Sequence, residues 1–151
     1  MKHHILLAGI IACAMGCFAS HQACAQDLRP VLQINGRYGY VDTANHWVIQ
    51  PQFKYAFPFS EGLALVRENR CFGYIDAKGK TVIKPIYDDA RPFADGMAAV
   101  MQGTKWGFVN KAGKVIAKPQ YDSVSDFADG KATVVLDGKE LRIDKNGKTV
   151  K

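Results

Sequence analysis

The chain has 151 residues, with 20 Lys+Arg against 14 Asp+Glu and a formal net charge of +6. This length suits one domain with its own hydrophobic core. The charge mildly favours anionic partners but is too modest to indicate nucleic-acid binding, so we expect no nucleic-acid ligand.

The N-terminus has the three-part layout of a signal peptide. A basic start at residues 2–4 precedes a nearly unbroken apolar run over residues 5–19, and the small-x-small site Ala23-Cys24-Ala25 follows. The apolar run is shorter than the roughly 20 residues of a membrane span. We therefore predict that residues 1–25 are a signal peptide, that cleavage follows Ala25, and that the mature chain has no transmembrane span.

Two alternatives for the N-terminus stay open. Ile10-Ile11-Ala12-Cys13 resembles a bacterial lipobox, which predicts a lipoprotein anchored through Cys13. The apolar run also suits an uncleaved anchor. All three readings place the chain outside the cytosol, and we expect a periplasmic or secreted protein.

The mature chain retains a single cysteine, Cys71, so it cannot form an intramolecular disulfide. Its stability must then come from packing. Its charge is 19 Lys+Arg minus 14 Asp+Glu, or +5, because only Lys2 is lost with the signal peptide. We expect Cys71 to act as a small hydrophobe in a strand, with pairing between chains as the alternative.

A tandem repeat with a period of 34 residues runs through the mature chain. Aromatic-Gly-aromatic triplets begin at Tyr38, Phe72 and Trp106. Four further positions keep the same spacing: Asp42, Asp76, Asn110 and Asp144; Pro51, Pro85 and Pro119; Phe59, Phe93 and Phe127; Gly62, Gly96 and Gly130. The repeats span residues 37–70, 71–104 and 105–139, between partial units at 26–36 and 140–151.

Each unit is predicted to form three strands. The first carries the aromatic-Gly-aromatic triplet and ends at an Asp-x-x-Gly-Lys turn, where Asp caps the backbone and Gly adopts positive φ. The second strand, residues 82–87 in the clearest unit, contains Pro85 and is therefore an edge strand or bends there. The third strand alternates apolar and polar residues.

Hairpins are predicted to follow the third strands around Gln102-Gly103 and Asp137-Gly138. No segment shows a sustained helical period. The fold class is therefore all-β, a stack of 34-residue repeats.

The partial units at the two ends leave the architecture open. Residues 31–36 align with a third strand and hairpin, and residues 141–148 align with a first strand and turn. Together they make nearly one unit, so a closed propeller-like ring could join them, whereas an open stack would use them as caps. We favour an open, strongly twisted β stack, because three units are few for closure.

The third unit has the most characteristic residues. They are Lys105-Trp106-Gly107-Phe108-Val109-Asn110, Gly113-Lys114, Pro119-Gln120-Tyr121-Asp122, Phe127 and Gly130-x-Ala132-x-Val134. This pattern resembles the WG repeat, also called the KWG repeat, over about residues 37–148. Tyr38 and Phe72 stand where Trp is usual, which keeps a large aromatic. The resemblance implies a bacterial β-rich repeat protein, often exported, with no known catalytic residues to transfer.

The sequence offers no constellation typical of an enzyme. Asp42, Asp76, Asn110 and Asp144 recur in every unit and are interpreted as turn caps, since Asn caps as well as Asp but cannot act as a base. His46 and Cys71 are isolated, so no metal or other cofactor is predicted. The serines lie in no nucleophile motif, and Asp88, Asp89, Asp122 and Asp126 lack the spacing of a calcium loop.

A hydrolase would need a convergent acid pair such as Glu61 with Glu68, which we do not expect. We predict a non-catalytic protein.

Two sets of residues are candidates for binding. Lysines recur at repeat register, namely Lys80, Lys114 and Lys148, and Lys84 and Lys118. In a stack they would form cationic ladders for an anionic polymer or lipid headgroups. The alternative, which we favour, is that they are solvated edge positions that discourage sheet aggregation.

The second set comprises aromatic residues that break the repeat, Trp47, Tyr55 and Phe57. Exposed aromatics can stack on sugars or anchor a partner. The alternative, again favoured, is that they bury the outer face of the first unit as a cap. We predict an exported, monomeric binding or scaffold protein with a protein or polymer partner in the bacterial envelope. The alternative function is carbohydrate or cell-wall binding.

Overall fold

The structure is a computed structural model that describes residues 25–151. Residues 1–24 lie outside the described residues, so the predicted signal peptide, except for Ala25, and the lipobox at Cys13 are not described. After a short 3-10 turn, η1 (Ala25–Asp27), the chain consists of β-strands, which confirms the predicted all-β class. Within residues 25–151, no helix has the length and apolar character needed to span a membrane.

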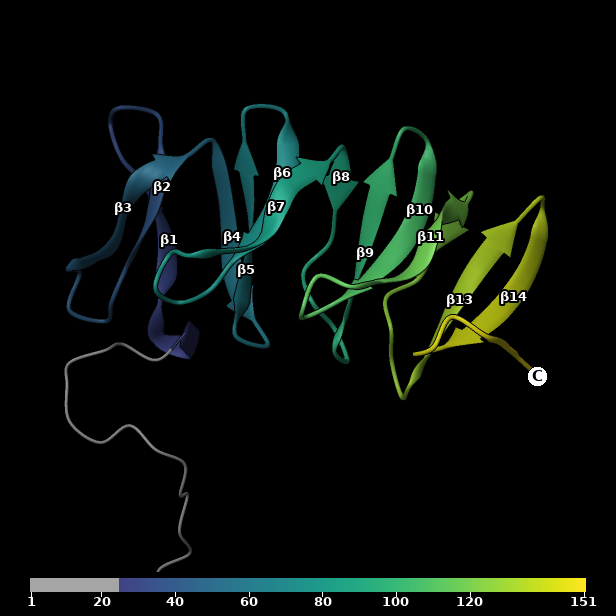
Figure 1. Ribbon diagram of the computed structural model, residues 1–151. Helices are drawn as coiled ribbons and strands as arrows, with labels where there is room; N and C mark the ends of the chain where they lie inside the picture. Colours follow the sequence, from purple (N-terminus) through teal and green to yellow (C-terminus); the bar gives the residue numbers. More distant parts are fainter. Residues whose placement is uncertain (1–24) are drawn as a thin grey trace, which may run out of the picture.

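The strands of the described residues form four separate antiparallel sheets (Figure 1). The first sheet contains β1 (Arg29–Leu32), β2 (Tyr38–Val41) and β3 (Trp47–Phe53). The second contains β4 (Tyr55–Ser60), β5 (Leu63–Glu68), β6 (Cys71–Ile75) and β7 (Thr81–Tyr87). The third contains β8 (Asp89–Ala90), β9 (Met97–Gln102), β10 (Lys105–Asn110) and β11 (Val115–Tyr121). The fourth contains β12 (Ser123–Val124), β13 (Lys131–Leu136), β14 (Lys139–Asp144) and β15 (Thr149–Val150).

Each sheet combines strands from two successive sequence repeats. In the second sheet, β5 is the third strand of one unit, and β6 and β7 are the first and second strands of the next. The prediction of three strands per unit was incomplete, because the linker adds a further strand, β4, β8 or β12. Strands β8 and β12 have two residues each, which is too short for an alternating pattern to reveal them.

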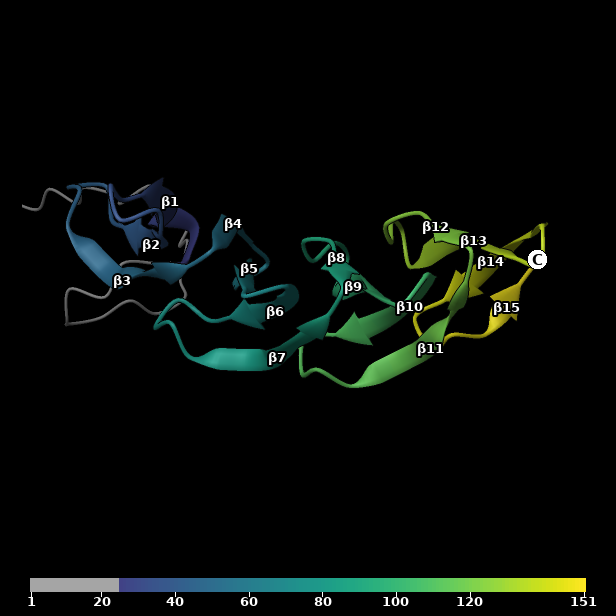
Figure 2. The same ribbon diagram turned by 90° about the horizontal axis from the view of Figure 1, so that it is seen from above.

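The four sheets stand in a row that does not close (Figure 1). Each partial unit completes the sheet at its own end: Leu32 of β1 pairs with Tyr38, and Ile143 of β14 pairs with Ala132. The predicted open stack is confirmed and the ring alternative is wrong. Seen from above, β4, β8 and β12 lie along one side of the row, and β7 and β11 lie along the other (Figure 2).

The hydrophobic core lies in three layers between neighbouring sheets. Along β5, Ala64 and Val66 face the first sheet, whereas Leu63 and Leu65 face the third. The second and third sheets are therefore apolar on both faces. The fourth sheet is apolar only towards the third, through Ala132, Val134 and Ile143. Its outer face carries Lys131, Thr133 and Arg142, the polar face expected of a terminal repeat.

The glycine of each triplet is required by the strand beside it. A Cβ on Gly107 would lie 2.5 Å from the Ala117 oxygen and 2.7 Å from the Pro119 nitrogen. The register between β10 and β11 shifts at this point, so the edge strand bulges across the glycine. Gly39 and Gly73 show the same close approach. The prediction that the proline-containing strand is an edge strand is confirmed for β3, β7 and β11.

The second aromatic of each triplet anchors the core. Tyr40, Tyr74 and Phe108 are at most 1% exposed and meet the linker phenylalanines Phe59, Phe93 and Phe127 edge-on, with ring centroids 4.8–4.9 Å apart. The two tyrosine hydroxyls donate hydrogen bonds to the carbonyl oxygens of Phe57 and Arg91, at 2.8 and 2.7 Å. Desolvation by burial raises the pKa of both tyrosines far above the usual range.

The turns are built as predicted. In each, one side-chain oxygen of Asp42, Asp76, Asn110 or Asp144 accepts hydrogen bonds from the backbone N–H groups two and four residues later. These backbone bonds lower the pKa of Asp42 and Asp144. One hairpin is displaced from its prediction, because Gln102 pairs with Lys105 and the loop is therefore Gly103-Thr104. The Asp137-Gly138 hairpin is confirmed.

Candidate functional site

The three aromatic residues that break the repeat do not form one cluster. Trp47 begins β3 and pairs with Val41, whereas Phe53 ends β3 and pairs with Tyr38. Tyr55, two residues after Phe53, stacks on Tyr38. Strand β3 has seven residues, so its two ends lie about 20 Å apart. The hypothesis of a joint Trp47/Tyr55/Phe57 platform is therefore wrong for Trp47, while Tyr55 and Phe57 share β4.

Arg67 is the centre of the surface around Tyr55. Tyr55, Arg67 and Phe72 are cross-strand partners on β4, β5 and β6. The guanidinium carbon of Arg67 lies 5.6 Å from the Tyr55 ring centroid and 5.3 Å from the Phe72 ring centroid. Both distances are typical of cation–π contacts.

Two more rings extend this surface. Tyr38 lies nearly parallel to Tyr55, with ring centroids 6.2 Å apart and an interplanar angle of 26°. Phe57 meets Phe72 at 6.5 Å in a tilted arrangement. Tyr55 is 47% exposed and Phe57 is 37% exposed, so solvent reaches both rings. We call Tyr38, Tyr55, Phe57, Arg67 and Phe72 the aromatic–arginine surface.

Arg67 lacks the polar partners that a half-buried cation normally has. Within residues 25–151 its guanidinium forms no ion pair and no hydrogen bond, and its Nε atom is buried without a partner. A buried polar atom without a partner is costly, and its presence calls for an explanation.

Arg91 also places its guanidinium against an aromatic ring, but it has hydrogen-bond partners within the protein. Its guanidinium lies 5.0 Å from the Trp106 ring centroid. Its Nη1 atom donates to the carbonyl oxygen of Val124 at 3.1 Å and to Asp126 at 3.2 Å. The protein therefore supplies an anion for Arg91 but none within its described residues for Arg67.

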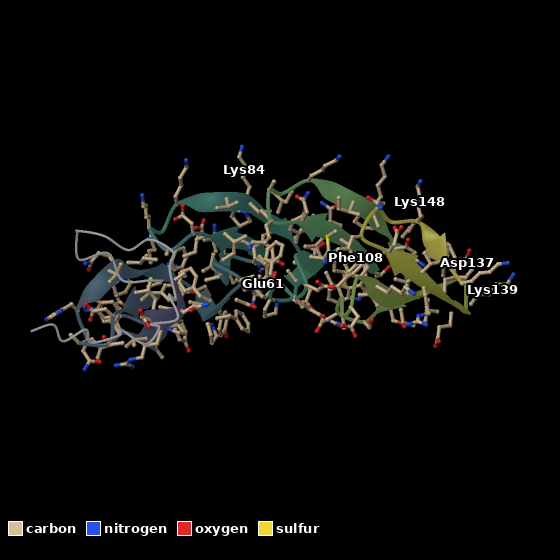
Figure 3. The ribbon with its side chains drawn as sticks, turned by 90° about the horizontal axis from the view of Figure 1, so that it is seen from below. Glu61, Lys84, Phe108, Asp137, Lys139 and Lys148 are labelled. Atoms are coloured by element: carbon tan, nitrogen blue, oxygen red, sulfur yellow. The ribbon has the colours of Figure 1, made fainter. Side chains whose placement is uncertain are left out.

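The predicted lysine ladders lie on exposed positions. Lys84 is on β7 and Lys118 is on β11, and Lys80, Lys114 and Lys148 lie in or beside the turns. Figure 3 shows Lys84 and Lys148 on the same side of the molecule. Within the described chain none of these five lysines forms an ion pair, whereas Lys105 pairs with Asp122 and Lys145 pairs with Asp95.

The acidic candidates are used in the scaffold. Glu61 accepts the backbone N–H of Gly96 at 2.8 Å and so links the second sheet to the third. Glu61 precedes β5 and Glu68 ends it, so these two carboxylates lie near opposite ends of one strand and form no pair. In residues 25–151, no three or more His, Cys, Asp or Glu side chains gather as a metal site would require.

The remaining titratable candidates stand apart from one another. The side chain of His46 is 80% exposed, and its Nδ1 atom lies 3.4 Å from Asp42. Cys71 is a half-buried free thiol at the start of β6.

Sequence reasoning missed the role of Arg67. By strand alternation Arg67 shares with Leu63 and Leu65 the face of β5 that is turned towards the third sheet, and the other repeats have Met101 and Val135 at this position. The signal was a charge at a position that is apolar in the other repeats. Its contacts with Tyr55 and Phe72 come from strand pairing, which the repeat alone does not reveal.

Comparison with known proteins places the fold in a family. No curated protein matches the chain. A solved structure similar to it is the crystal structure of the WD40 beta propeller domain of Doa1, with 12% sequence identity and a TM-score of 0.43. The match covers 83% of this chain and 50% of that one, so the chain spans half the length of the propeller chain. The model of the WG containing repeat matches residues 38–70, 72–106 and 106–139. The chain therefore belongs to the WG repeat family.

Proposed function

We propose that the protein is an exported, non-catalytic binding module of the bacterial envelope, and that its ligand docks on the aromatic–arginine surface. The observation that carries this proposal is the Arg67 guanidinium, which lies against the rings of Tyr55 and Phe72 without an anion or acceptor from the described chain. Unlike the buried Nε, the two Nη atoms of Arg67 are not buried and have no acceptor in the described chain, so an anionic oxygen of a ligand can pair with them.

The same surface favours an acidic polysaccharide over a protein partner. Exposed aromatic faces stack on the C–H faces of sugar rings. A guanidinium binds a carboxylate through two parallel hydrogen bonds, as a uronate would require. Tyr38 and Tyr55 add two phenol groups that can hydrogen-bond sugar hydroxyls. A sugar polymer with carboxylates thus matches both the rings and the charge.

A non-catalytic role is supported by what the polar groups already do. Asp42, Asp76 and Asp144 cap turns, and Asp126 neutralises Arg91. Glu61 and Asp95 accept backbone N–H groups of the following sheet. Each of these groups has a structural partner, which supports a role in the scaffold.

The test is binding of the purified protein to polysaccharides by isothermal titration, with a uronate-containing polymer and a neutral polymer of similar length. We expect the uronate polymer to bind. Arg67→Met, which keeps the side-chain length and removes the charge, should weaken binding at least tenfold. Arg91→Met is the matched control and should change affinity less than twofold. Absence of binding to every polysaccharide, with a protein captured instead through Tyr55 and Phe57, would favour the protein-partner alternative.

Export is tested separately by cell fractionation. A C-terminally tagged chain should appear outside the cytosol and begin at Gln26 by N-terminal sequencing. A mature chain that begins with a lipidated Cys13 would support the lipoprotein alternative. A full-length chain in the cytosol would contradict export.

A further inference from the structure

The exposed aliphatic side chains of the described residues are concentrated on the edge strands. Eight large hydrophobic side chains are exposed, and half of them lie on β3, β7 or β11, namely Val48, Val82, Ile86 and Val115. The others are at the N-terminal sheet and on the aromatic–arginine surface. Edge strands β7 and β11 lie on the same side of the row, opposite β4, β8 and β12 (Figure 2).

On β7 these aliphatic side chains alternate with a lysine. Ile83 and Tyr87 are buried, so Val82, Lys84 and Ile86 point outwards together. On β11 the corresponding positions are Ile116, Lys118 and Gln120. Lys80, Lys114 and Lys148 continue the positive charge through the adjoining turns. We call Lys80, Val82, Lys84, Ile86, Lys114, Lys118 and Lys148 the lysine edge.

Among the described residues, the carboxylates in the turns of the lysine edge form no ion pair with its lysines; the pKa of Asp144 is lowered mainly by the backbone N–H of Lys148 and to a smaller extent by the Lys148 charge. Asp76 and Asp144 belong to the same turns, and each directs one carboxylate oxygen at two backbone N–H groups. The third turn has the neutral Asn110 in their place. Within residues 25–151 no carboxylate lies within ion-pair distance of a lysine of this edge.

Protection against aggregation does not account for this edge. Lysines discourage another strand from pairing with an exposed edge. Here Pro85 and Pro119, together with the bulges, already interrupt the row of backbone donors. Exposed Val82 and Ile86, at 37% and 54%, act against such protection, since bare aliphatic groups favour association.

We propose that the lysine edge docks the protein on the surface of an anionic phospholipid bilayer. The five lysines lie against the headgroups, and Val82 and Ile86 enter the boundary between headgroups and acyl chains. A soluble polyanion would use only the lysines, so the aliphatic side chains between them favour a bilayer. The lysine edge and the aromatic–arginine surface share no residue, and β4, which carries Tyr55 and Phe57, lies on the other side of the row from β7 (Figure 2).

The test is co-sedimentation of the purified protein with vesicles. Vesicles of phosphatidylglycerol and phosphatidylcholine should bind the protein, and vesicles of phosphatidylcholine alone should not. Each lysine near an anionic surface contributes roughly a fivefold change in partitioning, so Lys84→Gln with Lys118→Gln should reduce binding about twentyfold. Lys105→Gln with Lys145→Gln removes the same charge from lysines that are already paired, and should reduce binding less than threefold.

A second variant separates bilayer docking from general polyanion binding. Val82→Ser with Ile86→Ser leaves the charge unchanged and should weaken vesicle binding at least threefold while leaving binding to dextran sulfate unaltered. Near-ultraviolet circular dichroism checks that each variant is folded. Equal losses in the two lysine pairs, an aliphatic variant that binds vesicles normally, or absence of binding to anionic vesicles would each overturn the proposal.

Discussion

The second and third sheets share one scaffold and differ in the surroundings of an arginine. Both place an arginine on the first aromatic of the triplet, Arg67 on Phe72 and Arg91 on Trp106. The two arginines come from different positions. Arg67 lies on β5, where the third sheet has Met101, and Arg91 follows β8, where the second sheet has Phe57.

The difference lies in what surrounds the cation. Arg91 reaches across to the fourth sheet and finds a carbonyl oxygen and the carboxylate of Asp126. Arg67 contacts only rings among its described neighbours. The repeat itself does not require the Arg67 charge, and for this reason our proposal places the ligand on the second sheet.

The largest effect tests whether the scaffold is shared. Gly73→Ala and Gly107→Ala should each reduce the free energy of unfolding by about 3 kcal/mol or more, because the new Cβ overlaps backbone atoms of the bulged edge strand. Chemical denaturation measures both. Gly103→Ala, whose Cβ would meet nothing within 4 Å, should cost only about 1 kcal/mol for its positive φ. A large loss in only one of the two sheets would break the equivalence.

The two arginines should differ in stability as well as in binding. Arg91→Met should reduce the free energy of unfolding by roughly 1–1.5 kcal/mol, mainly because the part-buried Val124 carbonyl loses a charged donor, since the solvent-exposed ion pair with Asp126 adds little. Arg67→Met should be neutral or stabilising, since it removes a buried atom without a partner and matches Met101. Denaturant titration measures the free energy of unfolding of both variants. Destabilisation by Arg67→Met as large as that by Arg91→Met would show that Arg67 is structural.

A smaller effect is expected at the second aromatic of the triplet. Tyr74→Phe removes the hydroxyl that donates to the Arg91 carbonyl at 2.7 Å and should cost about 1 kcal/mol. The third sheet already has Phe108 at this position and packs its ring in the same way. Thermal unfolding measures the change. A Tyr74→Phe protein as stable as the original would mean that ring packing alone sets this contact.

The smallest effect is expected from a fall in pH, through the ion pair between Lys105 and Asp122. Lys105, whose counterpart in the second sheet is Cys71, hydrogen-bonds to Asp122 and lowers the pKa of that carboxyl below its ordinary 3.8. The resulting stability is present above about pH 4 and is lost as the pH falls through the lowered value. The free energy of unfolding of Asp122→Asn, measured by chemical denaturation at several pH values, should therefore fall less steeply below about pH 4 than that of the original protein. Identical acid profiles for the two proteins would contradict this contribution.

Much of the fold followed from the residues in order. Three features depend on local geometry that one repeat already contains, namely the capping Asp or Asn, the edge-strand proline and the alternating third strand. The 34-residue period is the spacing at which these features recur. The short strands β8 and β12 were not predictable in this way, because two residues carry no period. The site was harder to predict: Tyr55 and Phe57 stood out because they break the repeat, but Arg67 acquired a role only when β4, β5 and β6 placed it against two rings.

The sequence by itself determined that this is a β repeat protein with recurring turn, glycine and aromatic positions, because the 34-residue period and the turn residues are visible without knowledge of which strands pair. The tertiary structure alone decided that the stack is open and that each sheet draws on two repeats. It also separated Trp47 from Tyr55, and it supplied an anion to Arg91 while leaving Arg67 without one. These outcomes depend on which strands become neighbours, and strand pairing is a property of the whole chain rather than of any one repeat.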